Sequence, residues 1–374
     1  MPALTHITEL VKRAARDAGF ELAGIAPVRE FNELAYFPEW IEAGHAGEMK
    51  YLEARDDSGR LKRESLRVAA PWARSVVVCA INYNTAQPYS TDVNDPQRGW
   101  ISRYAWGRED YHEAVLRKLR TVEKRLTDYL TARGDNESHA DTNTTSSDLA
   151  NETSFRTWCY VDTGPIVERV YAKYAGVGWI GKNTCVLNQK LGSWLFLGVI
   201  LTSLELIPDL PAPDRCGTCT RCLDACPTNA FLGPYQLDAN RCISYLTIEK
   251  RGAIPEELRD GIGKHVFGCD ICQDVCPWNR KAPTTTAPEF QPREKLVNPA
   301  LTWLSEMNAA DFRETFRGSP VRRAKLISLR RNAAIAMGNS GNREFLPTLE
   351  KLRDDEDSIV AESAAWALEK LARS

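Results

Sequence analysis

The sequence predicts a first region of mixed α/β (α+β) class, followed by a cysteine-rich region and a helical C-terminal segment. Over the first two-thirds of the 374 residues, short apolar segments rich in β-branched residues alternate with amphipathic helical patterns. Eight of the 11 cysteines lie between positions 216 and 276, and the last segment shows helical spacing only. Because an ordinary domain has roughly 100 to 200 residues, we expect several domains, and we place them at 1–207, 208–292 and 293–374.

The first region begins with a helix and two buried strands. Apolar residues recur at helical spacing over 7–18, and Gly19 follows where a helix C-cap is expected. Residues 20–26 and 76–81 are short β-branched runs typical of buried strands, whereas 111–130 has the pattern of a long amphipathic helix. These elements give the first region its mixed α/β character.

A strand, a turn and a helix follow a polar segment. Residues 134–154 are mostly Asn, Ser, Thr, Asp and Glu, so we expect an exposed insertion that contributes nothing to a core. A strand over 158–161 leads through a turn to a helix over 166–174, and 194–201 is a further apolar strand. Asp162 therefore lies at a strand end, where an aspartate commonly caps the next helix.

Composition and charge indicate a soluble globular protein. Apolar residues make up 43% and charged residues 26%, which argues against disorder and against a fibrous class. The net charge of −2 gives no overall attraction to nucleic acid, so a polyanion would need a local basic patch. No apolar run approaches the roughly 20 residues of a membrane helix, and the start does not read as a signal peptide. We expect a cytoplasmic monomer without a membrane partner.

The cysteine spacings predict two 4Fe-4S clusters. The run C-x2-C-x2-C-x3-C-P that begins at Cys216 has the spacing of bacterial ferredoxins, in which the fourth thiolate reaches across to the other cluster. A second run, C-x2-C-x3-C-P, begins at Cys269 and is preceded by Cys242. The crossing rule gives these two ligand sets: Cys216, Cys219, Cys222 and Cys276 for the first cluster, and Cys226, Cys242, Cys269 and Cys272 for the second.

Other roles for the cysteines fit the spacing less well. Sets of four cysteines also bind structural zinc, but zinc ribbons rarely place three cysteines in seven residues or a proline after the fourth. Cys79, Cys159 and Cys185 lie in apolar or strand surroundings outside the runs, where a free cysteine is usually a small buried hydrophobe. We expect no redox role for these three.

The last segment combines a repeat with a basic stripe. Residues 332–337 and 363–368 match one another at helical spacing, which indicates HEAT-like repeats that act either as a structural cap or as a binding surface. Between 311 and 331, seven basic residues stand against two acidic ones. Such a run is usually a solvated helix face, but it also suits RNA phosphates. The basic residues are Arg313, Arg317, Arg322, Arg323, Lys325, Arg330 and Arg331.

About 200 residues of α/β chain precede the clusters, which a simple electron carrier would not need. No G-x-G-x-x-G follows a predicted strand in them and no P-loop occurs, so the electron acceptor is another cofactor or the substrate. In this setting the chain resembles the epoxyqueuosine reductases, cobalamin-dependent enzymes of the last step of queuosine synthesis in tRNA. The resemblance runs nearly end to end, although 134–154 departs from the family pattern. It rests on the segments YAWGR at 104–108, VDTGP at 161–165, GVGWIGKNT at 176–184 and GSW at 192–194, on both cysteine runs and on the tail.

The resemblance implies the reduction of epoxyqueuosine to queuosine in the anticodon loop of tRNA. A low-potential donor such as flavodoxin or ferredoxin would feed electrons through the clusters to a cobalamin, and cob(I)alamin would open the epoxide. Asp162 matches the family's proposed proton donor, and a carboxyl beside an apolar corrin keeps its proton at neutral pH. The cobalamin would be base-off, without a protein histidine on cobalt. Consistent with that, the segment after Asp110 lacks the glycine of the D-x-H-x-x-G signature, so we expect His112 to be a surface residue.

Further cofactor contacts follow from the same resemblance. Lys182 and Asn183 would hydrogen-bond corrin amides or the nucleotide tail, although turn chemistry alone also explains them. Arg63 and Arg103 are weaker candidates for corrin or phosphate contact, since most arginines are surface residues. The backbone of Gly268, Cys269, Asp270 and Ile271 would pass close to the corrin.

Two other functions remain open at this point. The first is a cobalamin-dependent reductive dehalogenase acting on a small organohalide, although its usual twin-arginine export signal is absent. The second is a non-catalytic iron-sulfur electron carrier that uses its helical tail to bind a protein partner. Cobalamin binding separates the second alternative from both enzymes.

Overall fold

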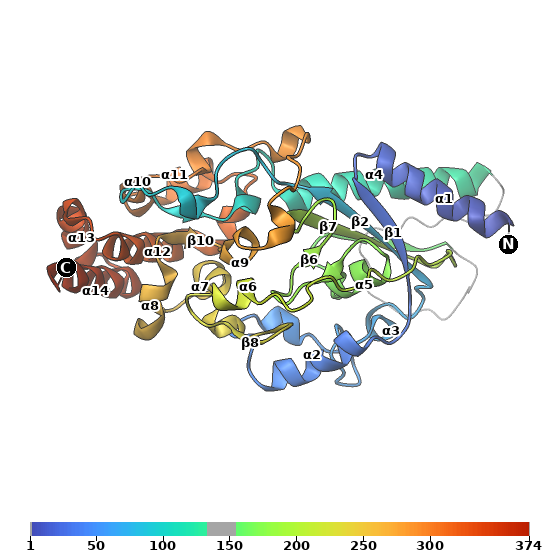
Figure 1. The fold of residues 1–374 in the computed structure, drawn as a ribbon, viewed down its shortest axis with the longest axis horizontal. Coiled ribbons are helices and arrows are strands. Elements are labelled where there is room, and N and C mark those ends of the chain that lie inside the picture. Colours follow the sequence, from blue (N-terminus) through green and yellow to red (C-terminus); the bar gives the residue numbers. More distant parts are fainter. Residues whose placement is uncertain (1, 133–154, 374) are drawn as a thin grey trace.

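The computed structural model describes residues 2–132 and 155–373, so the predicted insertion at 134–154 lies outside the described residues. The molecule is elongated, with the N-terminal region at one end of the long axis and the C-terminal helices at the other (Figure 1). The cysteine-rich region lies between them (Figure 1). None of the described helices is long and apolar enough to cross a membrane.

A four-stranded antiparallel sheet forms the centre of the first region. Its strand order is β1 (Leu22–Pro27), β2 (Ser75–Asn82), β7 (Leu195–Thr202) and β4 (Thr157–Tyr160). All residues of β2 are buried, because it is a central strand covered by helices on both faces. The strands predicted at 20–26, 76–81, 158–161 and 194–201 are therefore confirmed within two residues at each end.

Alternating side chains of β2 face two separate cores. Val77 and Cys79 point to the face that α1 (Pro2–Asp17) and α4 (Tyr111–Ala132) cover. Val76 and Val78 point to the opposite face, where α5 (Glu168–Tyr174) packs. The opposite face also carries α2 (Asn32–Glu42) and α3 (Leu66–Ala69). Helices on both faces of an antiparallel sheet make this region α+β.

Short elements carry the two cysteine runs. The helices α6 (Arg221–Asp224) and α9 (Ile271–Asp274) each hold one cysteine of a run and lie against one another. The strand β10 (His265–Phe267) pairs in parallel with β3 (Trp100–Ile101), which ties the cysteine region to the first region. The remaining elements here are β5 (Trp179–Ile180), β6 (Val186–Leu187), β8 (Phe231–Gly233), β9 (Gln236–Leu237), α7 (Ile243–Ile248) and α8 (Glu256–Ile262).

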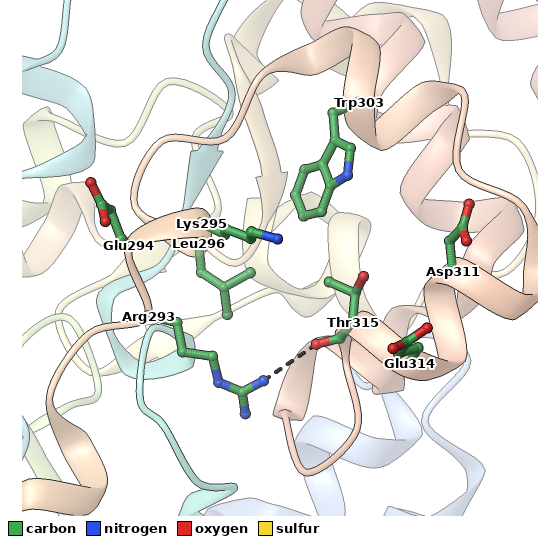
Figure 2. A pocket seen from close by; sticks show the side chains of 8 residues that line it. All are labelled: Arg293, Glu294, Lys295, Leu296, Trp303, Asp311, Glu314 and Thr315. Carbon is green, nitrogen blue, oxygen red and sulfur yellow. Dashed lines mark hydrogen bonds between the residues drawn. The ribbon is translucent and has the colours of Figure 1, made fainter.

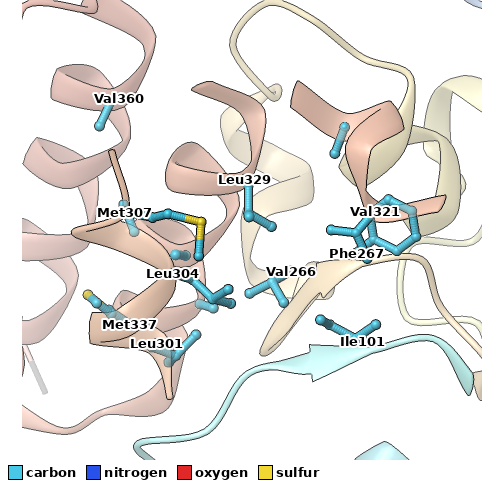
Figure 3. Packing of buried hydrophobic residues seen from close by; sticks show 14 of the residues in the cluster. Ile101, Val266, Phe267, Leu301, Leu304, Met307, Val321, Leu329, Met337 and Val360 are labelled. Atoms are coloured by element: carbon cyan, nitrogen blue, oxygen red, sulfur yellow. The ribbon is translucent and has the colours of Figure 1, made fainter. Parts of the chain in front are cut away.

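The C-terminal helices share a core with the rest of the chain. The repeat segments lie in α12 (Lys325–Ser340) and α14 (Ser358–Arg373), which pack against each other. Leu329 of α12 belongs to the same apolar cluster as Ile101 and Val266, as Figure 3 shows. The tail is thus continuous with the centre of the molecule; its assignment to HEAT repeats and the exact domain limits stay predictions. The other tail helices are α10 (Leu301–Ser305), α11 (Ala309–Thr315) and α13 (Leu346–Arg353).

Short 3-10 helices connect these elements. They are η1 (Lys50–Glu53), η2 (Ser90–Asp92), η3 (Arg103–Ala105), η4 (Ala239–Arg241), η5 (Pro277–Asn279), η6 (Pro288–Phe290), η7 (Glu294–Leu296), η8 (Pro320–Ala324) and η9 (Arg343–Phe345). Of these, η8 bears on the candidate site, because it carries part of the basic stripe toward the first region.

Candidate active site

The first predicted ligand set surrounds one cavity. Cysteines from both runs line a space of about 260 Å³; they are Cys216, Cys219, Cys222 and Cys276. Burial, together with the neighbouring Cys276 and Cys216, raises the pKa of the Cys222 thiol to about 11. Cys276 comes from the second run, so the structure brings together the set that the crossing rule predicts.

The second predicted set gathers beside an apolar core. Cys242 and Cys269 pack against the cluster that contains Ile243. Burial raises the pKa of Cys269 well above its ordinary value, and Cys242 and Cys226 add to the shift. A hydrogen bond to Cys185, burial and the charge of the neighbouring Cys269 all raise the pKa of Cys272. All these cysteines are free of disulfides, so each thiol is available as a ligand.

The loop before α9 is fixed between two regions. Gly268 has φ of 70°, and a Cβ there would lie 2.5 Å from Cβ of Ser102, so only glycine fits. The Cys269 amide donates to Oγ of Ser244 at 3.1 Å. Asp270 is buried and accepts hydrogen bonds from Oγ of Ser102 and the amide of Arg103, both at 2.6 Å. Ile271 opens α9. These contacts hold the second cysteine set rigidly against the first region.

Lys182 and Asn183 lie at the cysteine loops. Nζ of Lys182 donates to the carbonyls of Gly217 at 2.7 Å and Cys219 at 3.0 Å. Nδ2 of Asn183 donates to the carbonyl of Cys272 at 3.3 Å. Both residues also line the first cavity, so the structure joins them to the iron-sulfur site.

The two arginines predicted to contact a cofactor have different surroundings. Arg103 is only 3% exposed, and its guanidinium donates to the carbonyls of Thr85 and Gln87 at 2.8 and 2.9 Å. The prediction for the Arg103 side chain is therefore wrong, because its donors are used inside the protein. Arg63 is partly exposed and donates to the carbonyls of Tyr51 at 2.7 Å and Gly164 at 2.8 Å, close to Asp162 in the chain.

Side chains from three distant segments meet at Asp162. The phenol of Tyr111, at the start of α4, donates to Oδ2 of Asp162 at 3.0 Å. Nε2 of His112 and a guanidinium nitrogen of Arg323 in η8 each lie 3.9 Å from the same oxygen. The Asp162 side chain remains 57% exposed, so it can reach a bound molecule. This arrangement is a carboxyl held by a phenol, an imidazole and a guanidinium.

Asp162 does not cap the helix that follows it. The N-cap of α5 is Val167, and no side chain caps this helix. Asp162 has φ of 58°, a left-handed conformation that non-glycine residues seldom adopt and that clusters at functional sites. The predicted helix start at 166 is thus two residues early, and the capping role is excluded.

Sequence reasoning missed the partners of Asp162. His112 was expected to be a surface residue, but its Nδ1 lies 2.8 Å from Oδ1 of Asp110 and its other nitrogen faces Asp162. The Tyr111 ring stacks on Phe196 with centroids 4.4 Å apart, which fixes the phenol in place. The adjacent polar residues at a predicted helix start were the available signal, but their target becomes visible only in the fold.

A buried carboxyl lies next to this group. Oε1 of Glu168 is inaccessible to solvent and has no hydrogen-bond partner among the described residues. Burial, and then the charge of Asp162, raises the pKa of Glu168 to about 7. Glu168 therefore holds a proton close to neutral pH behind the candidate acid.

The basic stripe divides into exposed and internal residues. Arg323 pairs with Glu249, and Arg330 pairs with Asp355. Arg331 is 0% exposed and donates to the carbonyls of Leu246, Lys250 and Gly252, so its predicted contact with RNA is wrong. The residues that remain exposed are Arg313, Arg317, Arg322 and Lys325.

The tail also contains a larger pocket of about 490 Å³. Figure 2 shows Arg293 and Trp303 on two sides of it, and Arg293 donates to the carbonyl of Thr315 at 3.3 Å. Its lining mixes bases with acids and contains no cysteine, so it is separate from the iron-sulfur site. The lining residues are Arg293, Glu294, Lys295, Leu296, Trp303, Asp311, Glu314 and Thr315.

Comparison with known families explains both parts of this site. Residues 215–279 match a 4Fe-4S double cluster binding domain, and residues 63–163 match the family described as epoxyqueuosine reductase QueG. The epoxyqueuosine reductase of Pseudomonas aeruginosa is 39% identical over 375 residues, covering 99% of this chain and 96% of the relative. The chain belongs to the epoxyqueuosine reductase family. That of Synechocystis is 42% identical over 83% of this chain and 98% of its own length.

Solved structures of epoxyqueuosine reductases share the fold. One, determined with an epoxyqueuosine-modified stem loop of tyrosine tRNA, has a TM-score of 0.82 and 31% identity, covering 98% of this chain and 90% of that one. Another, from Bacillus subtilis, is described with an aspartate catalytic loop swung out of the active site; its TM-score is 0.81 at 30% identity, over 98% and 90% of the two chains.

The donor set of this chain fits two 4Fe-4S clusters. Each predicted set offers four thiols, and the first set surrounds a space with room for a cluster. The double-cluster match therefore settles the question between iron-sulfur clusters and structural zinc in favour of the clusters. The assignment of individual cysteines to each cluster stays a prediction supported by this geometry.

Proposed function

We propose that this protein reduces epoxyqueuosine to queuosine in the anticodon loop of tRNA, with a cobalamin and two 4Fe-4S clusters as cofactors. The observation that carries the proposal is the exposed Asp162 carboxyl, held by Tyr111 and Arg323 and connected to the second cysteine set. The connection runs through Tyr104. The centroid of its ring lies 5.9 Å from that of Tyr111, and its ring edge packs beside Gly268, so closely that a Cβ at this position would lie 3.5 Å from it.

The face around Asp162 suits a cobalamin. A bound cobalamin would supply a strongly nucleophilic metal centre for opening the epoxide. Tyr51 is 45% exposed, and Arg63 and Arg323 are partly exposed beside it, so this face offers donors that match the amide-rich edge of a corrin. The backbone of 268–271 would lie on the side of the corrin toward the clusters.

Asp162 would deliver a proton to the epoxide oxygen. The overall change takes up two electrons and two protons, removes the oxygen as water and leaves a carbon–carbon double bond. Tyr111 holds the carboxyl by its hydrogen bond, and Arg323 stabilises the carboxylate left after transfer. In the Bacillus subtilis relative the catalytic loop carries an aspartate, and Asp162 likewise lies on a loop, between β4 and α5.

The exposed part of the basic stripe would hold the tRNA. Arg313, Arg317, Arg322 and Lys325 offer positive charge to phosphates without reading bases. Because Arg323 of the same segment reaches Asp162, an RNA backbone bound to the stripe would pass beside the candidate acid. The modified base must leave its stack to enter the site, as enzymes acting on bases require. HEAT-like packing of α12 and α14 would supply the rigid support.

An anaerobic single-turnover assay tests the proposal. Reconstituted protein with cobalamin, a strong one-electron reductant and epoxyqueuosine tRNA should yield queuosine, seen as the loss of one oxygen by nucleoside mass spectrometry. Asp162→Asn should lower the rate by about 100-fold or more, because general acids typically contribute that much. Cobalamin content and iron content of the variant serve as controls for an intact site.

Other outcomes separate the alternatives. A holoprotein that retains cobalamin but leaves the epoxide untouched would contradict the assigned reaction and favour a small-molecule reductase. A reconstituted protein that binds no corrin would favour an electron carrier. An Asp162→Asn variant with full activity would overturn the acid role alone.

A further inference from the structure

The charged side chains that line the first cysteine cavity are basic. Three basic side chains, Lys182, Arg215 and Arg221, line this cavity together with the cysteines, and none of its described lining residues is acidic. Arg215 and Arg221 are exposed. Lys182 is tied to the loop carbonyls of Gly217 and Cys219, so its charge stays at the cavity.

The nearest acids in the chain, Asp214 and Asp224, keep their negative charge but are held by hydrogen bonds within the cysteine loops. Asp214 accepts hydrogen bonds from the Tyr235 phenol and from the amide of Cys216, the latter at 2.7 Å. Asp224 accepts from Oγ1 of Thr220 at 2.8 Å. Neither forms an ion pair with Arg215 or Arg221 among the described residues. The two arginines are therefore free to meet an external acidic surface.

Exposed apolar side chains lie next to these basic side chains. Leu232 is 50% exposed and Tyr235 is 42% exposed, on the hairpin of β8 and β9. The amide of Tyr235 donates to the carbonyl of Lys182 at 3.0 Å, which fixes the hairpin beside the cavity. An aromatic anchor with arginines at its side is the usual make-up of a protein interface core.

The two cysteine sets differ in their access to the surface. The second set packs against an apolar core with Ile243 and Ile271, whereas the first opens between exposed loop residues. The second set is also the one joined to Asp162 through Tyr104. An electron that enters from outside would thus arrive at the first cluster and leave inward through the second.

We propose that Lys182, Arg215 and Arg221, with Tyr235 and Leu232 beside them, form the docking surface for a small acidic one-electron carrier protein. The inference rests on the proposed function, which needs electrons at the clusters. Each encounter moves one electron from the carrier to the first cluster, and no bond forms or breaks. Two encounters supply one turnover. Small, transient interfaces steered by opposite charge are typical of electron-transfer partners.

Cluster reduction by a carrier measures docking directly. With photoreduced flavodoxin as the probe and no tRNA or cobalamin present, bleaching of the clusters gives a second-order rate in stopped flow. Arg215→Glu/Arg221→Glu should lower this rate by about tenfold or more at low ionic strength, because charge steering raises association rates by 10 to 1,000-fold. The difference should shrink in high salt, where exposed charges are screened.

Controls separate docking from an effect on the cluster itself. Arg343→Glu reverses an exposed charge in the tail and should leave the flavodoxin rate unchanged. Photoreduced deazariboflavin, a small uncharged reductant, should bleach the double variant at the native rate, and its iron content should be native. Arg221→Gln provides a milder change if the double variant loses its cluster, with an expected smaller loss in the same direction.

Two results would overturn the proposal. One is a native flavodoxin rate at low ionic strength in a variant with intact clusters. The other is equal slowing with flavodoxin and deazariboflavin, since the arginines would then serve the cluster rather than a partner. Neither result bears on the proposed reaction, because the single-turnover assay with a chemical reductant does not use the carrier.

Discussion

Asp162 is an ordinary residue type in an unusual conformation. Its φ of 58° turns the carboxyl away from the helix it would otherwise cap and toward Tyr111 and Arg323. Such a conformation costs of order 1 to 3 kcal/mol and persists only where the surroundings enforce it. Here a phenol from α4 and a guanidinium from η8 contribute to that enforcement, so the position of the acid depends on the whole fold.

Glu168 should make stability depend on pH in a predictable direction. Below pH about 4.3 both the folded and the unfolded glutamate hold a proton. Between that pH and about 7, the folded state alone keeps it, so the stability falls as pH rises and levels off above 7. The total loss is roughly 4 kcal/mol at most. Glu168→Gln removes it, so the variant should gain apparent unfolding temperature relative to the native protein between pH 5 and pH 8.

Scanning fluorimetry across this pH range checks the prediction. Glu9→Gln, an exchange at an exposed position of α1, is the matched control and should track the native protein. Parallel curves for Glu168→Gln and the native protein would show that the buried carboxyl titrates normally.

At the scale of elements, hydrophobic periodicity predicted the strands well, but counting charges did not predict which basic residues are exposed. The strands around 76–81 and 194–201 are long buried runs whose pattern depends only on local spacing, and both occur. The basic run 311–331 spans α11, η8 and α12, so its residues point in different directions. Arg331 lies on the inner face of α12 and Arg322 on the exposed side of η8. A count of charges cannot assign faces across breaks between elements.

The same limit applied to the site. The cysteine sets were predictable because ligand spacing within each run is local, and the crossing rule links the runs. The approach of Tyr111, His112 and Arg323 to Asp162 is not local, since these residues are brought together by packing of three elements. Arg103 was misjudged for this reason as well: its carbonyl partners come from the loop after β2, which no spacing rule connects to it.

A matched pair of substitutions tests this division of the stripe. Arg331→Met should lower the free energy of unfolding by about 3 kcal/mol, because three buried carbonyls lose their donor. Arg322→Met should leave stability within about 0.5 kcal/mol but reduce the salt dependence of tRNA binding by about one phosphate contact. Thermal unfolding and binding titrations at several salt concentrations measure the two effects.

The opposite pattern would contradict the assignment. If Arg331→Met kept full stability and weakened tRNA binding, the residue would have to leave its buried position to reach the RNA. If Arg322→Met left the salt dependence of binding unchanged, this face of η8 would not be the phosphate-binding surface.

At the scale of the molecule, the clusters lie where the regions join. The second cysteine set packs on the core that contains Ile243 and, from α12, Ile335. The tail core in turn includes Ile101 of β3 and Val266 of β10. One core of the sheet region is its own, whereas the cores of the cysteine region and of the tail include residues from their neighbours. Iron-sulfur binding is therefore coupled to the folding of the centre and, through it, to the tail.

Removal of iron should consequently destabilise the chain as one unit. Anaerobic chelation leaves buried thiols from both runs without their cation, and we expect one unfolding transition shifted down by about 10 °C or more. Restoring iron and sulfide should return the native transition. If chelation instead produced two transitions, one of them at the native temperature, the tail or the sheet region would be folding independently. The shared cluster of Ile101, Val266 and Leu329 argues against that, because these side chains cannot stay buried when β10 is lost.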